Sequence, residues 1–280
     1  MKKLLIEERL INAKLIPLIE HFVSASKCTD CFTSKGLVKN TCVVSGGQPR
    51  RVGSDYFEAQ NKICFVLLNP SGAVTKKETV WEENMERLSS DEHESEQAWN
   101  DFQDFLAEDE KNWSNGKWPK LYYGATELLE SEVSFVNAML CADDDDSYPP
   151  AAIANCLLHQ KKSLRAIQLL DPSMVVLSGQ DVINAFLKEE QKTTLKELRQ
   201  KRDSYYERWN DARKEDKLTL KHLENASFQK ISKSYLKKEI IDALPSAEFF
   251  WMGHYAARNA ESKRDADFFK YLLGIREALS

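Results

Sequence analysis

The chain has 280 residues, of which 42% are hydrophobic and 10% aromatic, enough for one large domain or two small ones with a substantial core. No apolar run approaches the roughly 20 residues needed to span a bilayer, and the N-terminal apolar stretch is too short for a signal peptide. We therefore expect a cytoplasmic protein without a membrane partner, whose six cysteines are thiols or metal ligands rather than disulfides.

The formal net charge of −5 hides a strongly uneven distribution. Residues 188–238 contain fifteen Lys or Arg against nine Asp or Glu, a local charge of +6. Residues 76–111 are the acidic counterpart, with thirteen Asp or Glu against four Lys or Arg. Because the distribution of charge matters more than its sum, the acidic total does not exclude a nucleic-acid partner.

In chain order, the pattern first predicts an amphipathic helix over 4–23, with Pro17 as a kink, and then a loop over 24–31. A second loop, 45–53, contains two adjacent arginines among turn formers. Four short, uniformly apolar runs follow, and they read as buried parallel strands: 62–68, 133–140, 174–177 and 249–252. Helical spacing recurs between them, over 78–111 and 151–170. This alternation predicts an α/β fold, a three-layer α/β/α sandwich around a short, mostly parallel four-stranded sheet.

Residues 186–243 differ from the rest of the chain. Glu, Lys, Arg and Leu dominate, and neither Pro nor Gly occurs in this stretch. The composition predicts two or three long solvated helices inserted between the third and fourth strands. We therefore expect a single domain over 1–280 with a helical basic insertion over 188–243.

Polar residues follow the predicted strands. Asn69 follows the first, Asn137 lies in the second, and His254 follows the fourth. Open α/β sheets bind ligands at the carboxyl ends of their strands, so these three side chains are expected to face one crevice. Taken singly, each has a simpler interpretation as a turn cap or a satisfied polar group.

The segments around these residues resemble motifs of the uracil-DNA glycosylase superfamily. Phe-Val-Leu-Leu-Asn69-Pro70-Ser-Gly resembles its first motif in the Asn-Pro version of the mismatch-specific branch. Ser134-Phe-Val-Asn137-Ala-Met-Leu-Cys141 is similar to the segment of the iron–sulfur branch in which a strand asparagine precedes a cluster cysteine. Residues 171–179 resemble that branch's third strand and turn, and Phe-Phe-Trp-Met-Gly-His254 is similar to the histidine motif. The resemblance covers roughly residues 20–187 and 245–275 and leaves the charged insertion unaccounted for.

The cysteines extend this resemblance. Cys28-x2-Cys31 and Cys141-x14-Cys156 are similar to the two ligand pairs of the iron–sulfur branch, which implies a 4Fe–4S cluster. Zinc suits four thiolates equally well by spacing, and unrelated buried thiols are the remaining alternative. Cys64 is expected in the core, and Cys42 is the one plausible substitute ligand.

The resemblance also implies roles. Asn69 would hold the attacking water, Asn137 would read the amide edge of a flipped pyrimidine, and a neutral His254 would donate to the base oxygen where charge accumulates. Ser71 and the displaced Arg258 would contact DNA. The small residues after Asn69-Pro70 suggest a roomier pocket than a strictly uracil-specific one, suited to a mismatched or modified pyrimidine.

Three departures weaken the expected grip on DNA. The family's His-Pro-Ser is His254-Tyr255-Ala256 here, Arg258 stands two places early, and an aspartate run occupies 143–146. The basic insertion is a candidate replacement, through Lys196, Arg199, Lys201 and Arg202, with a solvated hairpin or a protein-docking arm as the alternative.

The sequence thus predicts a monomeric DNA glycosylase that acts on uracil or a modified or mismatched pyrimidine. The alternative is a non-catalytic iron–sulfur protein of the same fold that binds nucleic acid. A nucleotide-binding enzyme is disfavoured, because no glycine-rich phosphate loop follows any predicted strand.

Overall fold

The computed structural model describes residues 2–31, 43–45, 47–68, 76–89, 91–112, 132–143, 149–192 and 230–252. Its helices are α1 (Lys2–Ser26), α2 (Lys76–Leu88), α3 (Glu92–Asn112), α5 (Pro150–Ala154), α6 (Lys162–Leu170), α7 (Gln180–Phe186) and α10 (Lys238–Ala243). A π-helical turn, η5 (Asn155–His159), and two 3-10 turns, η6 (Glu189–Gln191) and η8 (Lys233–Tyr235), join them. The strands are β1 (Val43–Ser45), β2 (Ile63–Leu67), β3 (Val133–Asn137), β4 (Ala142–Asp143), β5 (Met174–Ser178), β6 (Lys230–Ile231) and β7 (Glu248–Met252).

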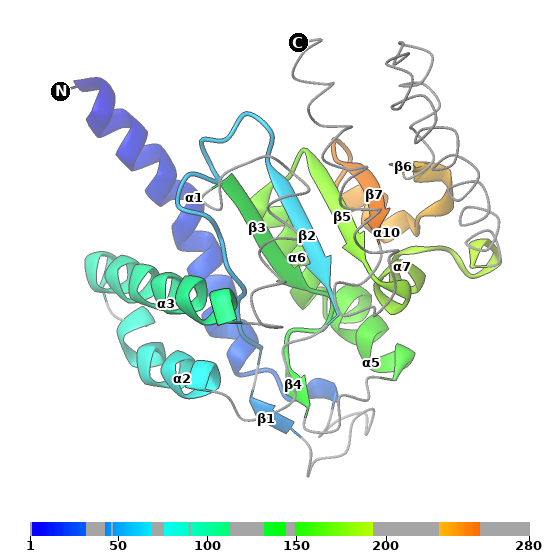
Figure 1. Cartoon of the computed structure of the whole chain (residues 1–280), viewed down its shortest axis with the longest axis horizontal. Helices are drawn as coiled ribbons and strands as arrows, with labels where there is room; N and C mark the ends of the chain where they lie inside the picture. The colour runs from blue at the N-terminus through cyan, green and yellow to red at the C-terminus, as the bar shows by residue number, and fades with distance from the viewer. Residues whose placement is uncertain are drawn as a thin grey trace.

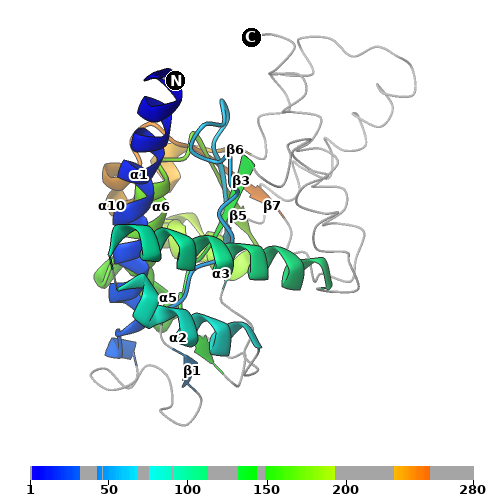
Figure 2. The ribbon, with the colours of Figure 1, turned by 90° about the vertical axis from the view of Figure 1, so that its left-hand side faces the viewer.

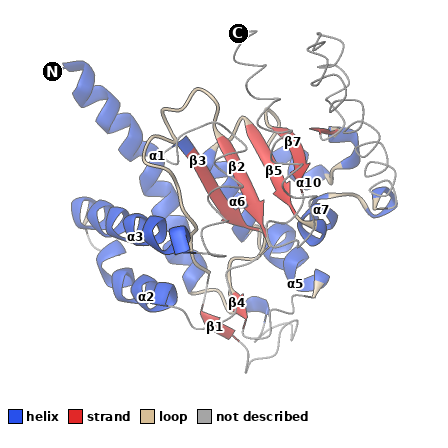
Figure 3. Ribbon diagram, in the orientation of Figure 1, coloured by secondary structure: helices blue, strands red, loops and turns tan. Residues whose placement is uncertain are grey.

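The main sheet has the strand order β3-β2-β5-β7-β6 within the described residues (Figure 1). The first four strands are parallel and are the four that the sequence predicts. Compared with the predicted ranges, β2 and β3 are shorter, by up to three residues at one end, and β5 and β7 are each one residue longer. The α/β class and the mostly parallel sheet are therefore confirmed (Figure 3). The predicted strand number is wrong, because β6 adds an antiparallel fifth strand beside β7.

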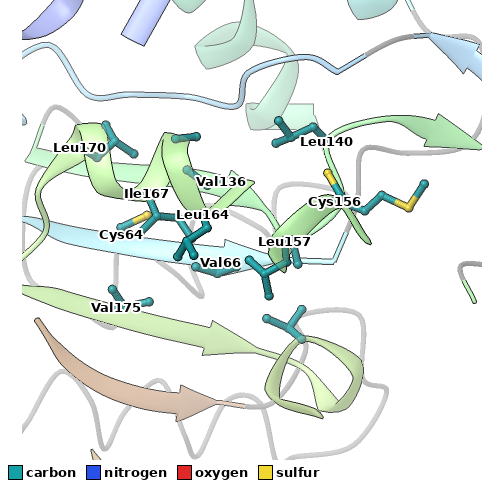
Figure 4. Close-up of a cluster of buried hydrophobic side chains, with 14 of the residues drawn as sticks. Cys64, Val66, Val136, Leu140, Cys156, Leu157, Leu164, Ile167, Leu170 and Val175 are labelled. Carbon is teal, nitrogen blue, oxygen red and sulfur yellow. The ribbon is translucent and has the colours of Figure 1, made fainter. Parts of the chain in front are cut away.

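The parallel strands are mostly apolar, in keeping with their burial. Every residue of β2, β3 and β5 is buried, as is typical of strands in the interior of an α/β domain. One face of the sheet packs against α6, where Leu164 and Ile167 meet Cys64, Val66 and neighbouring side chains (Figure 4). The prediction that Cys64 belongs to the core is confirmed, and its burial raises the pKa of its thiol to about 12.

The helices α1 and α6 lie together on this side of the sheet (Figure 2). The prediction of a loop over 24–31 is wrong in its first residues, because α1 runs unbroken through Pro17 to Ser26. The region 78–111 divides into α2 and α3, which pack against each other. No described helix has the length and apolar character needed to cross a membrane.

The loop predicted over 45–53 is irregular but not exposed. Val52 forms an antiparallel bridge with Ser134, and the Phe135 amide donates to the Arg51 carbonyl oxygen at 2.8 Å. These bonds cover the outer edge of β3, which would otherwise present unpaired backbone groups. Arg50 and Arg51 are both buried there, 3% and 8% exposed, which the turn-forming composition did not indicate.

The predicted helical insertion is partly wrong in its C-terminal part. Residues 230–231 form a strand, and Leu236 and Ile240 are buried in the core. The Lys237 amide donates to the Phe186 carbonyl oxygen at 3.0 Å, which joins the C-terminal part of the insertion to the end of α7, just before the insertion begins. Residues 193–229, the middle of the predicted insertion, lie outside the described residues.

Candidate functional site

Two of the predicted metal ligands follow the end of α1. The Cys28 amide donates to the Ala25 carbonyl oxygen at 3.0 Å, a turn that carries the chain out of the helix. Cys28 is half-buried and Cys31 is buried. The short spacing therefore places both thiols on one turn beyond a core helix.

The other two come from separate elements. Cys141 precedes β4, and Cys156 lies in η5. Pro150 begins α5, where its missing amide proton costs nothing. The helix then widens into the π turn, closed by a bond from the Gln160 amide to the Asn155 carbonyl oxygen at 2.8 Å. A π turn separates successive side chains by a smaller angle than an α turn, so Asn155, Cys156 and Leu157 all face inward.

The segment at 47–48 brings the two cysteine pairs together. The Gly47 amide donates to the Ala25 carbonyl oxygen at 3.2 Å, and the Gln48 amide donates to the Leu140 carbonyl oxygen at 3.3 Å. One contact lies three residues before Cys28 and the other immediately before Cys141. A Cβ on Gly47 would lie 2.8 Å from the Ala25 carbonyl oxygen, so only glycine permits this approach.

The Cys141 and Cys156 thiols both lie close enough to Cys28 and Cys31 to interact with them electrostatically. Burial raises the pKa of the Cys141 thiol well above its usual value, and the neighbouring Cys156, Cys31 and Cys28 raise it further. Burial likewise raises the pKa of Cys156 to about 11, with smaller contributions from Cys31 and Cys28. Four converging thiols form a donor set that suits an iron–sulfur cluster or zinc. In the described part of the chain, no three Cys, His, Asp or Glu side chains are already gathered as closely as metal ligands.

Two side chains that the sequence analysis did not consider make hydrogen bonds to these sulfurs. Asn155 Nδ2 donates to Cys31 Sγ at 3.2 Å, and Asn155 is 1% exposed. Ser163 Oγ lies 3.3 Å from Cys156 Sγ and donates to the Ala138 carbonyl oxygen at 2.8 Å. The position of Asn155 directly before a predicted ligand was the available signal, but spacing alone does not show which sulfur it reaches.

The second predicted site, the crevice at the carboxyl ends of the strands, is partly described. A cavity of about 200 Å³ opens there, lined by Leu68 at the end of β2 and by residues 178–182 at the end of β5. Gly179 has φ 93°, a conformation that favours glycine, and it turns the chain from β5 directly into α7. The strand and the turn expected over 171–179 are therefore present.

Asn137 ends β3 on the same edge of the sheet. It pairs in register with Leu67, and the Met139 amide donates to the Leu68 carbonyl oxygen at 2.9 Å. Asn137 is 0% exposed, yet among the described residues neither its Oδ1 nor its Nδ2 has a hydrogen-bond partner. A buried amide left without partners costs about 1–3 kcal/mol, so this one calls for an explanation.

The remaining predicted site residues lie outside the described part of the chain. These are Asn69, Ser71, Lys196, Arg199, Lys201, Arg202, His254 and Arg258, together with the substitute ligand Cys42. The chain leaves the described residues at Leu68 and Met252, the carboxyl ends of β2 and β7, immediately before the segments that contain Asn69 and His254.

No protein-family model matches this sequence, and no curated protein matches it.

Proposed function

We propose that the protein is a DNA glycosylase that hydrolyses the N-glycosidic bond of uracil, or of a modified or mismatched pyrimidine, flipped out of DNA. The resemblance of its four motifs to the uracil-DNA glycosylase superfamily motivates this proposal. We further propose that it acts in the cytoplasm as a monomer, a setting that suits reduced thiols.

One observation carries the proposal: the buried amide of Asn137, without described partners, at the carboxyl end of β3. An amide donates and accepts at once, as recognition of the carbonyl and imide groups of a pyrimidine requires. A flipped base would supply the two missing hydrogen bonds, so the energetic penalty of the free protein would become binding specificity.

The neighbouring strand ends are suited to the other roles. Asn69 is the second residue after β2, the strand that pairs with β3, and would hold the attacking water. His254 is the second residue after β7 and would donate to the base oxygen as negative charge develops on the leaving group. The cavity beside Leu68 and Gly179 lies between these two strand ends in the order of the sheet.

We propose that Cys28, Cys31, Cys141 and Cys156 bind a 4Fe–4S cluster, with zinc as the alternative metal. Such a group would supply structural cross-linking between the end of α1 and the β3–α6 region. Ser71, Arg258 and the basic residues of the insertion would bind the DNA.

Base excision tests the proposal directly. Purified protein is incubated with oligonucleotides that contain uracil or a 5-modified pyrimidine, and alkali-labile abasic sites are counted. We expect excision by the wild type, loss of turnover with retained affinity for abasic DNA in Asn69→Ala, and a rate about 10²–10³ lower in His254→Ala. Binding without abasic sites on any substrate would instead establish the non-catalytic alternative, and wild-type rates in both variants would place the active site elsewhere.

A further inference from the structure

We propose that Asn155 is a positioning residue for the metal centre: its side-chain amide donates a hydrogen bond to the sulfur of Cys31 and thereby sets the affinity and the reduction potential of the bound metal. This inference rests on the proposed role of the four cysteines as ligands. It is independent of base excision, which the metal measurements below do not use.

The geometry of this bond spans the two cysteine pairs. Asn155 precedes the fourth cysteine in the chain, but its amide reaches the second, Cys31, 124 residues earlier, at 3.2 Å. The bond therefore connects η5 with the turn that follows α1. A cysteine that ligates a metal is a thiolate, which accepts hydrogen bonds and cannot donate them, so the orientation of the Asn155 amide already suits the metal-bound state.

Both partners in this hydrogen bond are buried. Asn155 is 1% exposed and Cys31 is 5% exposed, so water does not compete freely for the sulfur. Hydrogen bonds to cysteine sulfur stabilise the more negative, reduced form of an iron–sulfur cluster most strongly. Loss of the bond should therefore lower the reduction potential of the cluster and the affinity of the site for its metal.

Ser163 also lies beside a cysteine sulfur, but its hydroxyl is engaged differently from the Asn155 amide. Its hydroxyl lies 3.3 Å from Cys156 Sγ, but its single proton is donated to the Ala138 carbonyl oxygen at 2.8 Å. A Cys156 thiolate would have to compete with that carbonyl for the same proton. The Asn155 amide already donates to the Cys31 sulfur, so it is the stronger candidate of the two.

The test uses Asn155→Leu, which keeps a similar volume, and Asn155→Ala, which avoids overpacking if leucine prevents folding. The matched control is Asn184→Leu, because Asn184 is an asparagine of α7 that accepts a hydrogen bond from Gln180 Nε2 at 2.9 Å. Protein is prepared anaerobically, its iron, sulfide and zinc are measured, and folding is checked by circular dichroism.

We expect both Asn155 variants to release metal to a chelator at 10- to 100-fold lower chelator concentration than the wild type, the usual effect of losing an outer-shell partner. In iron–sulfur protein we also expect the equilibrium for cluster reduction to fall about tenfold, equivalent to roughly 59 mV for a one-electron couple. The control should match the wild type in both measurements.

Folded Asn155 variants whose metal affinity and potential equal those of Asn184→Leu would overturn the inference, while leaving the cysteine site and base excision untouched. Wild-type protein that binds neither iron nor zinc would overturn it together with the proposed cofactor. Absence of base excision by the wild type, together with the expected metal properties of the Asn155 variants, would overturn only the proposed catalytic function.

Discussion

The cysteine region and the strand-end crevice are built in different ways. In the cysteine region the chemical groups converge from three separate parts of the chain, and backbone bonds at Gly47 and Gln48 fix their approach. In the crevice the parallel register of the strands alone aligns Asn137 with the end of β2. The first site therefore depends on tertiary contacts between distant segments, whereas the second follows from the topology of the sheet.

This difference implies different responses to mutation. A site assembled from distant segments should lose its metal and its local stability together, because its ligands also connect those segments. A site that contains a buried amide without described partners should behave in the opposite way, with activity and stability changing in opposite directions.

The largest effect is expected from the cysteines. With the proposed cluster bound, the purified protein should be brown, and serine at Cys28, Cys31, Cys141 or Cys156 should abolish that colour, because each substitution removes one of four thiolates. Absorbance at about 400 nm, together with iron and sulfide analysis, measures the loss of the cluster.

Cys64→Ser is the control for these variants, since Cys64 is buried against α6 in the core and should leave the cluster in place. If anaerobically prepared wild-type protein contains stoichiometric zinc and neither iron nor sulfide, the bound metal is zinc and not an iron–sulfur cluster. If one of the four serine variants stays brown, the cysteine replaced in that variant is not a ligand of the cluster.

Asn137→Leu should separate activity from stability. Replacing the buried amide with an apolar side chain of similar size removes its desolvation penalty, so the free energy of unfolding should rise by about 1–3 kcal/mol. Excision should fall by a factor of about 10² or more, because the base loses its donor and acceptor. Denaturant unfolding and single-turnover excision measure the two effects.

Asn184→Leu is again the matched control, because Asn184 already has a partner in Gln180 and its loss should give no gain in stability. A destabilised Asn137→Leu protein would mean that the amide has a structural partner. Unchanged excision would mean that Asn137 does not read the base.

A smaller effect is expected from the basic insertion. Neutralising Lys196, Arg199, Lys201 and Arg202 together should weaken DNA binding and flatten its salt dependence by about one unit of slope per lost phosphate contact. Fluorescence anisotropy over a range of salt concentrations measures both. Unchanged affinity and slope would assign the insertion to protein docking.

The smallest effect concerns pH and the junction of α1 with α6. His21 Nε2 lies 2.7 Å from the Lys162 carbonyl oxygen, and burial, with Lys162 and Arg165 nearby, lowers the pKa of His21 below its usual 6.5. Below pH 6.5 the unfolded chain binds a proton that the folded protein does not yet bind, so stability is lost as the pH falls toward the lowered pKa.

Unfolding curves between about pH 7.5 and pH 5 should show this loss in the wild type, because unperturbed histidine titrates in that range. The loss should be smaller in His21→Gln, which keeps a polar side chain that does not titrate there. Because α1 leads to Cys28 and α6 follows η5, the same acidification should loosen the cysteine region before the crevice. An identical pH dependence in the variant would show that another group is responsible.

Short, uniformly apolar runs were sufficient to locate the four parallel strands, because a strand buried on both faces has no alternation of polar and apolar residues. This signal failed at β6, a two-residue edge strand within a charged segment, which pairs with β7 only because the tertiary fold brings them together. Composition predicted the loop over 45–53 but gave no sign that Arg50 and Arg51 within it are buried. Their burial results from the backbone bonds that segment makes to β3, which composition does not encode.

For the candidate site, the sequence by itself determined which residues are available: two cysteine pairs at recognisable spacing and polar residues at the ends of apolar strands. Only the tertiary structure decided that the two pairs approach each other, that the amide of Asn155 reaches Cys31, and that Asn137 is buried without described partners. Local spacing encodes local geometry, since the chain fixes the reach of neighbouring residues. Contacts between residues more than a hundred positions apart depend on how helices and strands pack, which no short segment specifies.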